Sequence, residues 1–212
     1  MRHERIKVLN LCAGIGGNRK HWEGCDVTAV ELEPEIAAVY KRMFPNDVVI
    51  VGDALQYLLD RSHEFDYVWI SPPCQTHSRM MKATRHKKRR FVDMTLYQVI
   101  IFLTHFYKGY WVVENVKPFY KPLIKPTAII GRHYIWSNYS IPKFELRSPQ
   151  GFITGTSVEA AERLKEWLGI HYEGNLYYKN NHCPAQILRN CVHPLLGQHV
   201  FNCRPEQLEL AL

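Results

Sequence analysis

The sequence predicts an α/β fold with a doubly wound, mostly parallel sheet. Over residues 6–116, apolar segments of strand length alternate with segments whose apolar residues have helical spacing. Short strand–helix–strand units of this kind are typical of parallel sheets covered by helices. The 212 residues suffice for one domain with a substantial core and a small additional lobe.

Five strands and four helices are expected in chain order. The strands are residues 6–11, 25–30, 47–51, 65–70 and 110–113, and the helices are residues 34–44, 54–60, 94–107 and 158–168. Pro34 suits the first turn of its helix, where no backbone N–H is needed. Asp53 is a suitable N-cap for the second helix. One further helical segment is expected at residues 190–201.

Polar or reactive residues follow each of the five expected strands. In chain order they are Gly14, Glu31, Asp53, Cys74 and Glu114. Because the carboxyl ends of parallel strands meet at one edge of a sheet, where open α/β sheets bind ligands, these residues are expected to share one site.

Cys74 follows a rigid turn. Pro72 and Pro73 cannot extend the strand ladder or begin a helix, and each fixes its own φ angle. The Cys74 side chain is therefore expected to be held outside the sheet edge as a nucleophile. The alternative is a small buried cysteine beside a stiff turn.

The glycine-rich turn and Asp53 each have two interpretations. The glycine-rich CAGIGG at residues 12–17 is compatible with a dinucleotide site or with a plain tight turn. Glu31 is placed to accept hydrogen bonds from a ribose diol. Asp53 either caps a helix or accepts from an adenine amino group, and both can hold at once.

Charge and composition narrow the function class. The net charge is +7, and residues 79–90 hold seven Lys and Arg and no acid, so the rest of the chain balances to zero. Such a segment favours a polyanionic partner, the alternative being a solvated loop. Six cysteines without CxxC pairs, no secretory signal and no membrane-length apolar segment predict reduced thiols and a cytoplasmic protein without a membrane partner.

The ordered set of LCAGIGG at 11–17, Glu31, GD at 52–53, PPCQ at 72–75 and ENV at 114–116 resembles the S-adenosylmethionine-dependent DNA cytosine-5 methyltransferases. QILRNCVHPLL at 186–196 is similar to the last motif of that family, in which Asn190 is the matching asparagine. The resemblance covers roughly the first 120 and the last 30 residues and implies a Rossmann-like class I methyltransferase fold.

The resemblance also implies roles for individual residues. The Cys74 thiolate would add to cytosine C6 so that C5 can attack a methyl group, and Glu114 would act at N3 if its environment raises its pKa. The cofactor would be S-adenosylmethionine, with Gly14, Gly16 and Gly17 at its methionine moiety, Glu31 at the ribose, Asp53 at the adenine, and Pro72 and Asn190 completing the site. The partner would be DNA, either a duplex with the base flipped out or a single strand.

Some features depart from the family pattern. The usual Arg-x-Arg pair is reduced to Arg132, followed by His133, and either residue is a candidate to support the nucleophile or a surface residue on a strand. After Cys74 the sequence QTHS replaces the usual Phe-Ser ending, which leaves Gln75 and Ser78 for phosphate or base contacts. The expected nucleic-acid contacts are Gln75, Ser78, Arg85, Lys87, Lys88, Arg89 and Arg90.

The recognition region is short. We expect a catalytic domain at 1–137, a reduced target-recognition lobe at 138–183 and a C-terminal segment at 184–212 that returns to the catalytic domain. So small a lobe predicts a short or degenerate target, or a separate specificity partner. Cys183, Cys191, His193, His199 and Cys203 match no common zinc spacing, so no metal is expected.

Two other functions stay open. The first is cytosine-5 methylation of RNA or of a free pyrimidine nucleotide, which uses the same carbon chemistry. The second is a non-catalytic DNA-binding or partner subunit, which would not need Cys74 and Glu114 at converging strand ends. The compact size suggests an orphan of a phage or mobile element, or part of a restriction–modification system, in a bacterial cytoplasm.

Overall fold

A seven-stranded mixed sheet forms the centre of the molecule. The computed structural model describes residues 5–78, 91–147, 155–178 and 181–205. The strand order is β3-β2-β1-β4-β5-β7-β6. The strands are β1 (Ile6–Leu11), β2 (Cys25–Glu31), β3 (Val48–Val51), β4 (Tyr67–Ile70), β5 (Tyr110–Val116), β6 (Ala128–Ile130) and β7 (His133–Ser137).

The sheet is doubly wound. Strands β1 to β5 pair in parallel, and the chain moves outward from β1 to β3 before it crosses back to β4 on the other side. The strand order therefore reverses between β1 and β4, which is the kind of position where α/β sheets bind ligands. Only β7 and β6 run antiparallel, beside β5. The expected doubly wound, mostly parallel fold is confirmed.

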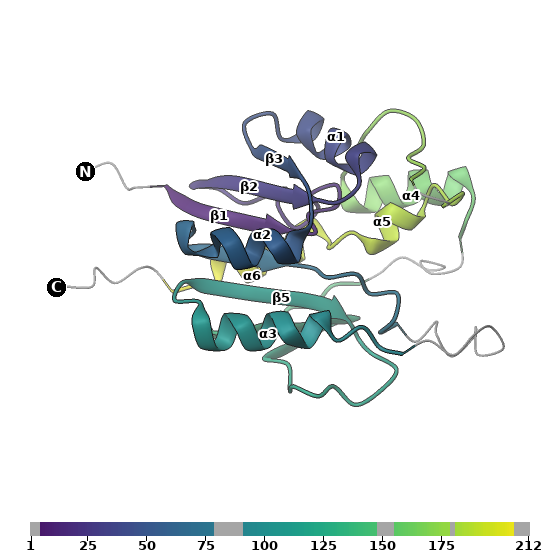
Figure 1. The fold of residues 1–212 in the computed structure, drawn as a ribbon. Helices are drawn as coiled ribbons and strands as arrows, with labels where there is room; N and C mark the ends of the chain where they lie inside the picture. Colours follow the sequence, from purple (N-terminus) through teal and green to yellow (C-terminus); the bar gives the residue numbers. More distant parts are fainter. Residues whose placement is uncertain (1–4, 79–90, 148–154, 179–180, 206–212) are drawn as a thin grey trace.

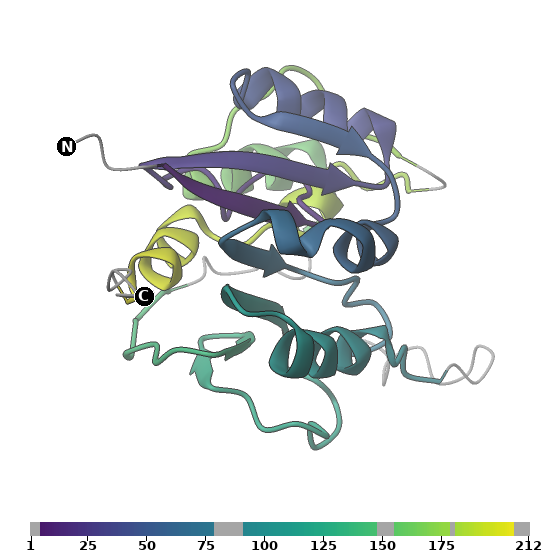
Figure 2. The ribbon, with the colours of Figure 1, turned by 60° about the vertical axis from the view of Figure 1, so that its left-hand side comes forward.

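Helices cover both faces of the sheet. They are α1 (Pro34–Met43), α2 (Ala54–Arg61), α3 (Thr95–Phe106), α4 (Val158–Leu168), α5 (Gln186–Asn190) and α6 (Pro194–Asn202), with a short 3-10 turn at Ser62–Glu64. Helices α2 and α3 pack on one face with Leu9, Val68 and Val113, whereas α6 packs on the other with Trp69 and Val112 (Figures 1 and 2). Buried residues on both faces explain why the central strands are almost continuously apolar.

Helices α4 and α5 pack against α1. Leu164 and Leu168 of α4 share a buried cluster with Leu188 of α5 and with Ile36 and Val39 of α1. Figure 1 shows α4 and α5 beside α1, toward the side to which the β5 arrow points. The described part of the expected recognition lobe therefore lies next to the carboxyl ends of the strands.

The structure corrects one element and adds two. The helical segment expected at 190–201 is confirmed over residues 194–201, which lie in α6, and is wrong at its start, because α5 ends at Asn190 and α6 begins at Pro194. Cys191 and His193 between them are extended, and His193 directly precedes a proline, where extended backbone is favoured. The antiparallel β6–β7 hairpin was not among the expected strands.

Two general expectations concern the described residues. Among the ranges given above, no helix is long and apolar enough to cross a membrane. All six cysteines lie in those ranges and are free thiols, as expected. The basic segment 79–90, with Arg85, Lys87, Lys88, Arg89 and Arg90, lies outside the described residues.

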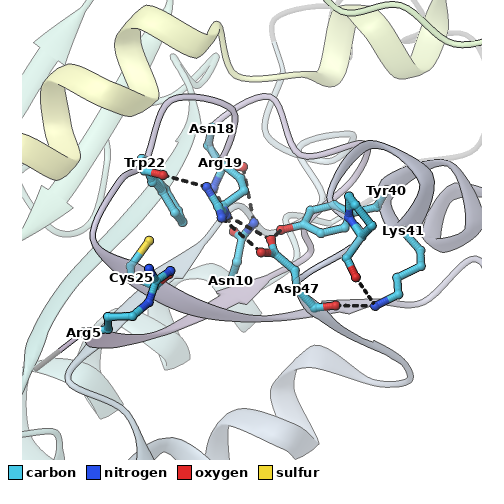
Figure 3. Close-up of polar contacts among 10 residues, drawn as sticks. Arg5, Asn10, Asn18, Arg19, Trp22, Cys25, Tyr40, Lys41 and Asp47 are labelled. Atoms are coloured by element: carbon cyan, nitrogen blue, oxygen red, sulfur yellow. Dashed lines mark hydrogen bonds and ion pairs between the residues drawn. The ribbon is translucent and has the colours of Figure 1, made fainter.

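A buried polar network connects the segment after the glycine-rich turn to α1 and the start of β3. The Arg19 Nε and Nη2 atoms donate to the two Asp47 carboxylate oxygens at 2.9 and 3.0 Å, and Tyr40 Oη donates to Asp47 Oδ2 at 2.9 Å (Figure 3). Arg19 also donates to the Trp22 carbonyl. The Arg19 and Asp47 side chains are only 13% and 4% exposed, so removing one leaves a buried charge behind.

We expect Asp47→Ala to destabilise the fold by about 3–5 kcal/mol, because Arg19 then stays buried without a counter-charge. Urea unfolding followed by circular dichroism measures the free energy of unfolding. The matched control is Asp26→Ala, which breaks the Arg5–Asp26 pair, whose side chains are 59% and 64% exposed. That loss should stay within about 1 kcal/mol. Equal losses for the two variants would contradict the structural role of Asp47.

Candidate active site

A cavity of about 360 Å³ lies at the carboxyl edge of the sheet. Its size is that of a small-molecule site. The expected site residues that line it are Gly14, Gly17, Glu31, Asp53, Pro72, Cys74, Gln75, Glu114, Arg132 and Asn190. Gly16 and Ser78 do not line it. Tyr178 lines it as well, so residues from all three expected segments, 1–137, 138–183 and 184–212, meet in one cavity.

Glu31 is held rigidly at the end of β2. Its Oε2 atom accepts from the Gly14 N–H at 2.8 Å, and its Oε1 atom accepts from the Glu33 N–H at 3.1 Å. The carboxylate thus connects the glycine-rich turn to the start of α1. Each carboxylate oxygen has further acceptor capacity, so Glu31 can still bind the hydroxyl groups of a sugar.

Asp53 forms the expected helix cap. Its Oδ1 atom accepts from the Gln56 N–H at 2.8 Å, and its side chain also belongs to the cavity lining. Cys12, on the opposite wall, has a positive φ angle of 51°, which is uncommon for a residue other than glycine. Burial and the nearby Glu31 and Asp53 raise the pKa of Cys12 to about 12, so this thiol stays neutral.

The second and third glycines of the turn serve close packing. A Cβ atom at Gly16 would lie 2.3 Å from the Phe44 ring and 2.8 Å from the Tyr40 ring. A Cβ atom at Gly17 would lie 2.1 Å from Cys191 Sγ. Gly16 therefore lets the turn rest on the aromatic rings of α1 and its C-cap. Gly17 lets the segment after α5 approach the turn, which brings Asn190 to the cavity.

The turn that carries Cys74 is fixed from two sides. Asn115 Nδ2, from β5, donates to the Pro72 carbonyl at 3.0 Å. The N–H groups of His77 and Ser78 both donate to the Cys74 carbonyl at 3.0 Å. Asn115 was not recognised from the sequence as a site residue, although its place directly after Glu114 was the available signal.

Cys74 is a thiol whose charge state depends on its neighbours. Burial raises its pKa above the ordinary cysteine value, the nearby Glu114 raises it further, and Arg132 lowers it. The thiol is therefore mostly protonated near neutral pH, and it needs either a base or a change of local charge to become the reactive thiolate.

Glu114 is paired with His133. Its Oε1 atom lies 2.6 Å from His133 Nδ1, and both side chains are buried. Burial alone would raise the pKa of Glu114, but the charge and hydrogen bond of His133, helped by Ser71 and Arg132, lower it overall. The condition of a raised pKa is therefore not met in the protein as it stands, and Glu114 is a carboxylate that accepts the Nδ1–H of His133.

Arg132 lies at the same end of the cavity. Its Nη2 atom donates to the Arg189 carbonyl at 2.6 Å, so the turn before β7 is tied to α5. Burial lowers the pKa of Arg132, and the neighbouring Glu114 and Cys74 oppose that shift. Tyr178 also lines the cavity. Tyr178 carries no specific signal in the sequence, where it belongs to a polar aromatic stretch at residues 172–181.

The described residues offer no group of three or more His, Cys, Asp or Glu side chains placed to hold a metal ion. The C-terminal candidates have other contacts. Cys183 accepts a hydrogen bond from Arg189, Cys191 packs on Gly17, and His193 caps α6. His199 Nε2 lies 3.1 Å from the Pro142 carbonyl.

The lining fits S-adenosylmethionine on chemical grounds. A fixed carboxylate at the end of β2 suits a ribose diol, and Asp53 at the end of β3 offers an acceptor to an adenine amino group. Cys74 and Glu114 lie beyond these residues, at the ends of β4 and β5. A cofactor bound between the β1, β2 and β3 ends would therefore adjoin the two groups suited to covalent chemistry.

Residues 6–127, more than half of the chain, match the family model described as C-5 cytosine-specific DNA methylase. No match was found among curated proteins.

Solved structures similar to this chain include Spodoptera frugiperda DNMT2, at 21% identity over 81% of this chain and 61% of that one, with a TM-score of 0.43. A DNA modification methyltransferase encoded within an E. coli prophage matches at 19% identity over 55% of this chain, with a TM-score of 0.37. A SAM-dependent methyltransferase from Agrobacterium tumefaciens matches at 17% identity over 55% of this chain, with a TM-score of 0.39. This chain spans 33% and 40% of the length of those last two proteins.

The family match includes the glycine-rich turn, Glu31, Asp53, Cys74 and Glu114, all of which the fold brings to one cavity. The chain belongs to the C-5 cytosine-specific DNA methylase family, the methyltransferases that use S-adenosylmethionine as their methyl donor.

Proposed function

We propose that this chain methylates C5 of cytosine in DNA, with Cys74 as the nucleophile and Glu114 acting at N3. The observation that carries the proposal is that a thiol and a buried carboxyl group share one cavity with Gly14, Glu31 and Asp53. A non-catalytic binding module would not need a thiol whose charge state responds to both Glu114 and Arg132.

The residues of the chain would act on the base one after another. Cys74 Sγ bonds to cytosine C6, and electrons from the ring move toward N3, which takes up a proton from the side of Glu114. S-adenosylmethionine supplies the electrophilic methyl group that C5 then attacks. A base removes the C5 proton, and the Sγ–C6 bond breaks. A cytosine within a duplex must be flipped out of the stack to reach Cys74.

Target recognition would rest on few contacts. Residues 138–183 are the proposed recognition lobe, and the described part of them packs on α1 while Tyr178 reaches the cavity. One good bidentate contact discriminates between bases by about 1–3 kcal/mol, so a small lobe defines few positions. We therefore propose a short or degenerate target, unless a separate partner adds recognition.

The basic segment 79–90 would add affinity without sequence information. It lies outside the described residues, but its two flanks are described. The Asp93 N–H donates to Thr76 Oγ1 at 3.0 Å, and both Gln75 and Asp93 line the cavity. Described residues on both sides of the segment therefore lie at the cavity, and its seven cations would contact the phosphates of a bound nucleic acid.

Transfer of labelled methyl groups tests the function directly. Purified protein should label duplex or single-stranded DNA, and sequencing of the product should show modified cytosines in many contexts that share a short core of about two to four bases. An RNA substrate is the parallel arm. Labelling of RNA alone would assign a different nucleic acid to the same chemistry, and a strict site of six or more bases would contradict the limited recognition.

We expect Cys74→Ala to abolish methyl transfer while the fold and S-adenosylmethionine binding persist, because Pro72, Pro73 and Asn115 set the turn without the thiol. Wild type should form a denaturant-resistant adduct with DNA that carries 5-fluorocytosine, since fluorine cannot leave C5 as a proton does. Cys203→Ala, at a thiol outside the cavity lining, is the matched control and should keep both properties. Methylation by Cys74→Ala would exclude the covalent mechanism.

Replacement of Lys87, Lys88, Arg89 and Arg90 together by Ala should weaken binding to all DNA sequences alike. Each lost phosphate contact should reduce the slope of log affinity against log salt by about 0.7–0.9. Fluorescence anisotropy at several salt concentrations measures that slope. The control is Lys121→Ala, which removes an exposed cation outside the segment. A loss of affinity restricted to one DNA sequence would instead mean that this segment reads bases.

A further inference from the structure

The Glu114–His133 pair is the most buried charged contact of the active site. Its Nδ1–Oε1 distance is 2.6 Å, at the short end for a charge-assisted hydrogen bond, and the two side chains are 6% and 7% exposed. A carboxylate only accepts, so His133 carries its proton on Nδ1. The pair is therefore a fixed unit in a site that excludes most water.

The sheet explains why these residues meet. In the antiparallel pairing of β5 with β7, Glu114 lies opposite Ile135 and Val116 lies opposite His133. His133 is two residues from Ile135, so its side chain is on the same face as Glu114 and diagonal to it. A long carboxylate and an imidazole reach across that diagonal without leaving the ladder.

Other titratable and polar groups face the pair from every side. Ser71 and Cys74 come from the segment after β4, Arg132 from the turn before β7, and Cys191 and His193 from the segment before α6. Of these five side chains, Arg132 is the permanent cation. It also donates to the Arg189 carbonyl. His133 makes the 2.6 Å contact with Glu114, and Ser71 also donates to that carboxylate. His133 is therefore the imidazole best placed to respond when Glu114 gains or loses a proton.

We propose that His133 is a positioning residue for Glu114, and that the two side chains work as one titrating pair that lends a proton to N3 of the cytosine. The inference rests on the proposed function and deepens it. Arg132, whose charge does not titrate near neutral pH, would set the local potential, whereas the pair would make the addition step depend on pH.

The proton and electron balance is simple. The Sγ–C6 bond forms from the Cys74 thiolate, the ring electrons move to N3, and one proton passes from the pair to N3. The pair is left as a neutral imidazole beside a carboxylate. When C5 has been methylated and has lost its proton to a base, the Sγ–C6 bond breaks. The N3 proton then returns to the pair, so the pair is restored and the methyl donor is the reactant consumed besides the cytosine.

The decisive comparison is the pH dependence of turnover in wild type and in His133→Asn. Asn offers a neutral N–H donor to Glu114 but does not titrate. Between about pH 6 and 9, the ratio of the wild-type rate to the variant rate should fall as pH rises, by up to about tenfold per pH unit, because only wild type loses the extra proton of the pair. Cys74 titrates in both proteins, and because a protonated pair favours its thiolate only in wild type, this coupling changes the ratio in the same direction.

A second variant distinguishes the loss of a titrating group from a local packing defect at residue 133. His133→Arg keeps its proton at every pH used and should give a wild-type to variant ratio that also falls with pH. His199→Asn, at a histidine outside the cavity lining, is the control whose ratio should stay constant. Circular dichroism and calorimetric binding of S-adenosylmethionine establish that each variant is folded.

The outcomes separate the two proposals. A constant ratio for folded His133→Asn and His133→Arg, in an active wild type, would overturn the titrating pair and leave His133 with a purely structural hydrogen bond. A wild type that neither transfers methyl groups nor forms the 5-fluorocytosine adduct would overturn the proposed function, and the role of the pair with it.

Discussion

Parallel pairing of β1 with both of its neighbours is the constraint on which the site depends. Leu11 is level with Val30 on β2 and with Ile70 on β4, and Ile70 is level with Val113 on β5. The residues that come next, Cys12, Glu31, Ser71 and Glu114, therefore lie at the same height near the carboxyl edge of the sheet. Cofactor-side and nucleophile-side residues, which are far apart in the sequence, meet for this reason and not through a dedicated contact.

The antiparallel β7 completes the site in a way that a parallel strand could not. Because β7 runs opposite to β5, its amino end lies at the edge where the other strands end. Arg132 and His133 consequently reach the cavity from the start of a strand. The same reversal lets Arg132 hold the Arg189 carbonyl, so the hairpin also fixes the segment that presents Asn190.

The sequence was informative wherever one residue type served one local purpose. The strand ends at Glu31 and Asp53, and the Pro72–Pro73 turn, follow from short-range rules. The sequence was less informative where a residue distant in the chain determines the backbone packing or the pKa at a position. Gly17 is needed because Cys191 approaches it. The pKa of Glu114 is lowered because His133 lies diagonally across the β5–β7 pairing, and β7 was not among the expected strands. Both effects depend on residues distant in the sequence, which periodicity cannot pair.

The charges of Cys74 and Glu114 are coupled, and the coupling has a direction useful to the proposed reaction. Glu114 as a carboxylate raises the pKa of Cys74, while Arg132 lowers it. If the Glu114–His133 pair takes up a proton, the local negative charge falls and the thiolate becomes more favourable. The proton that the pair passes to N3 therefore also favours the Cys74 thiolate, and the addition of that thiolate to C6 is what makes N3 take up the proton. In the resting protein the thiol stays neutral, which limits its reaction with other electrophiles, and a protonated pair beside the bound base would activate it.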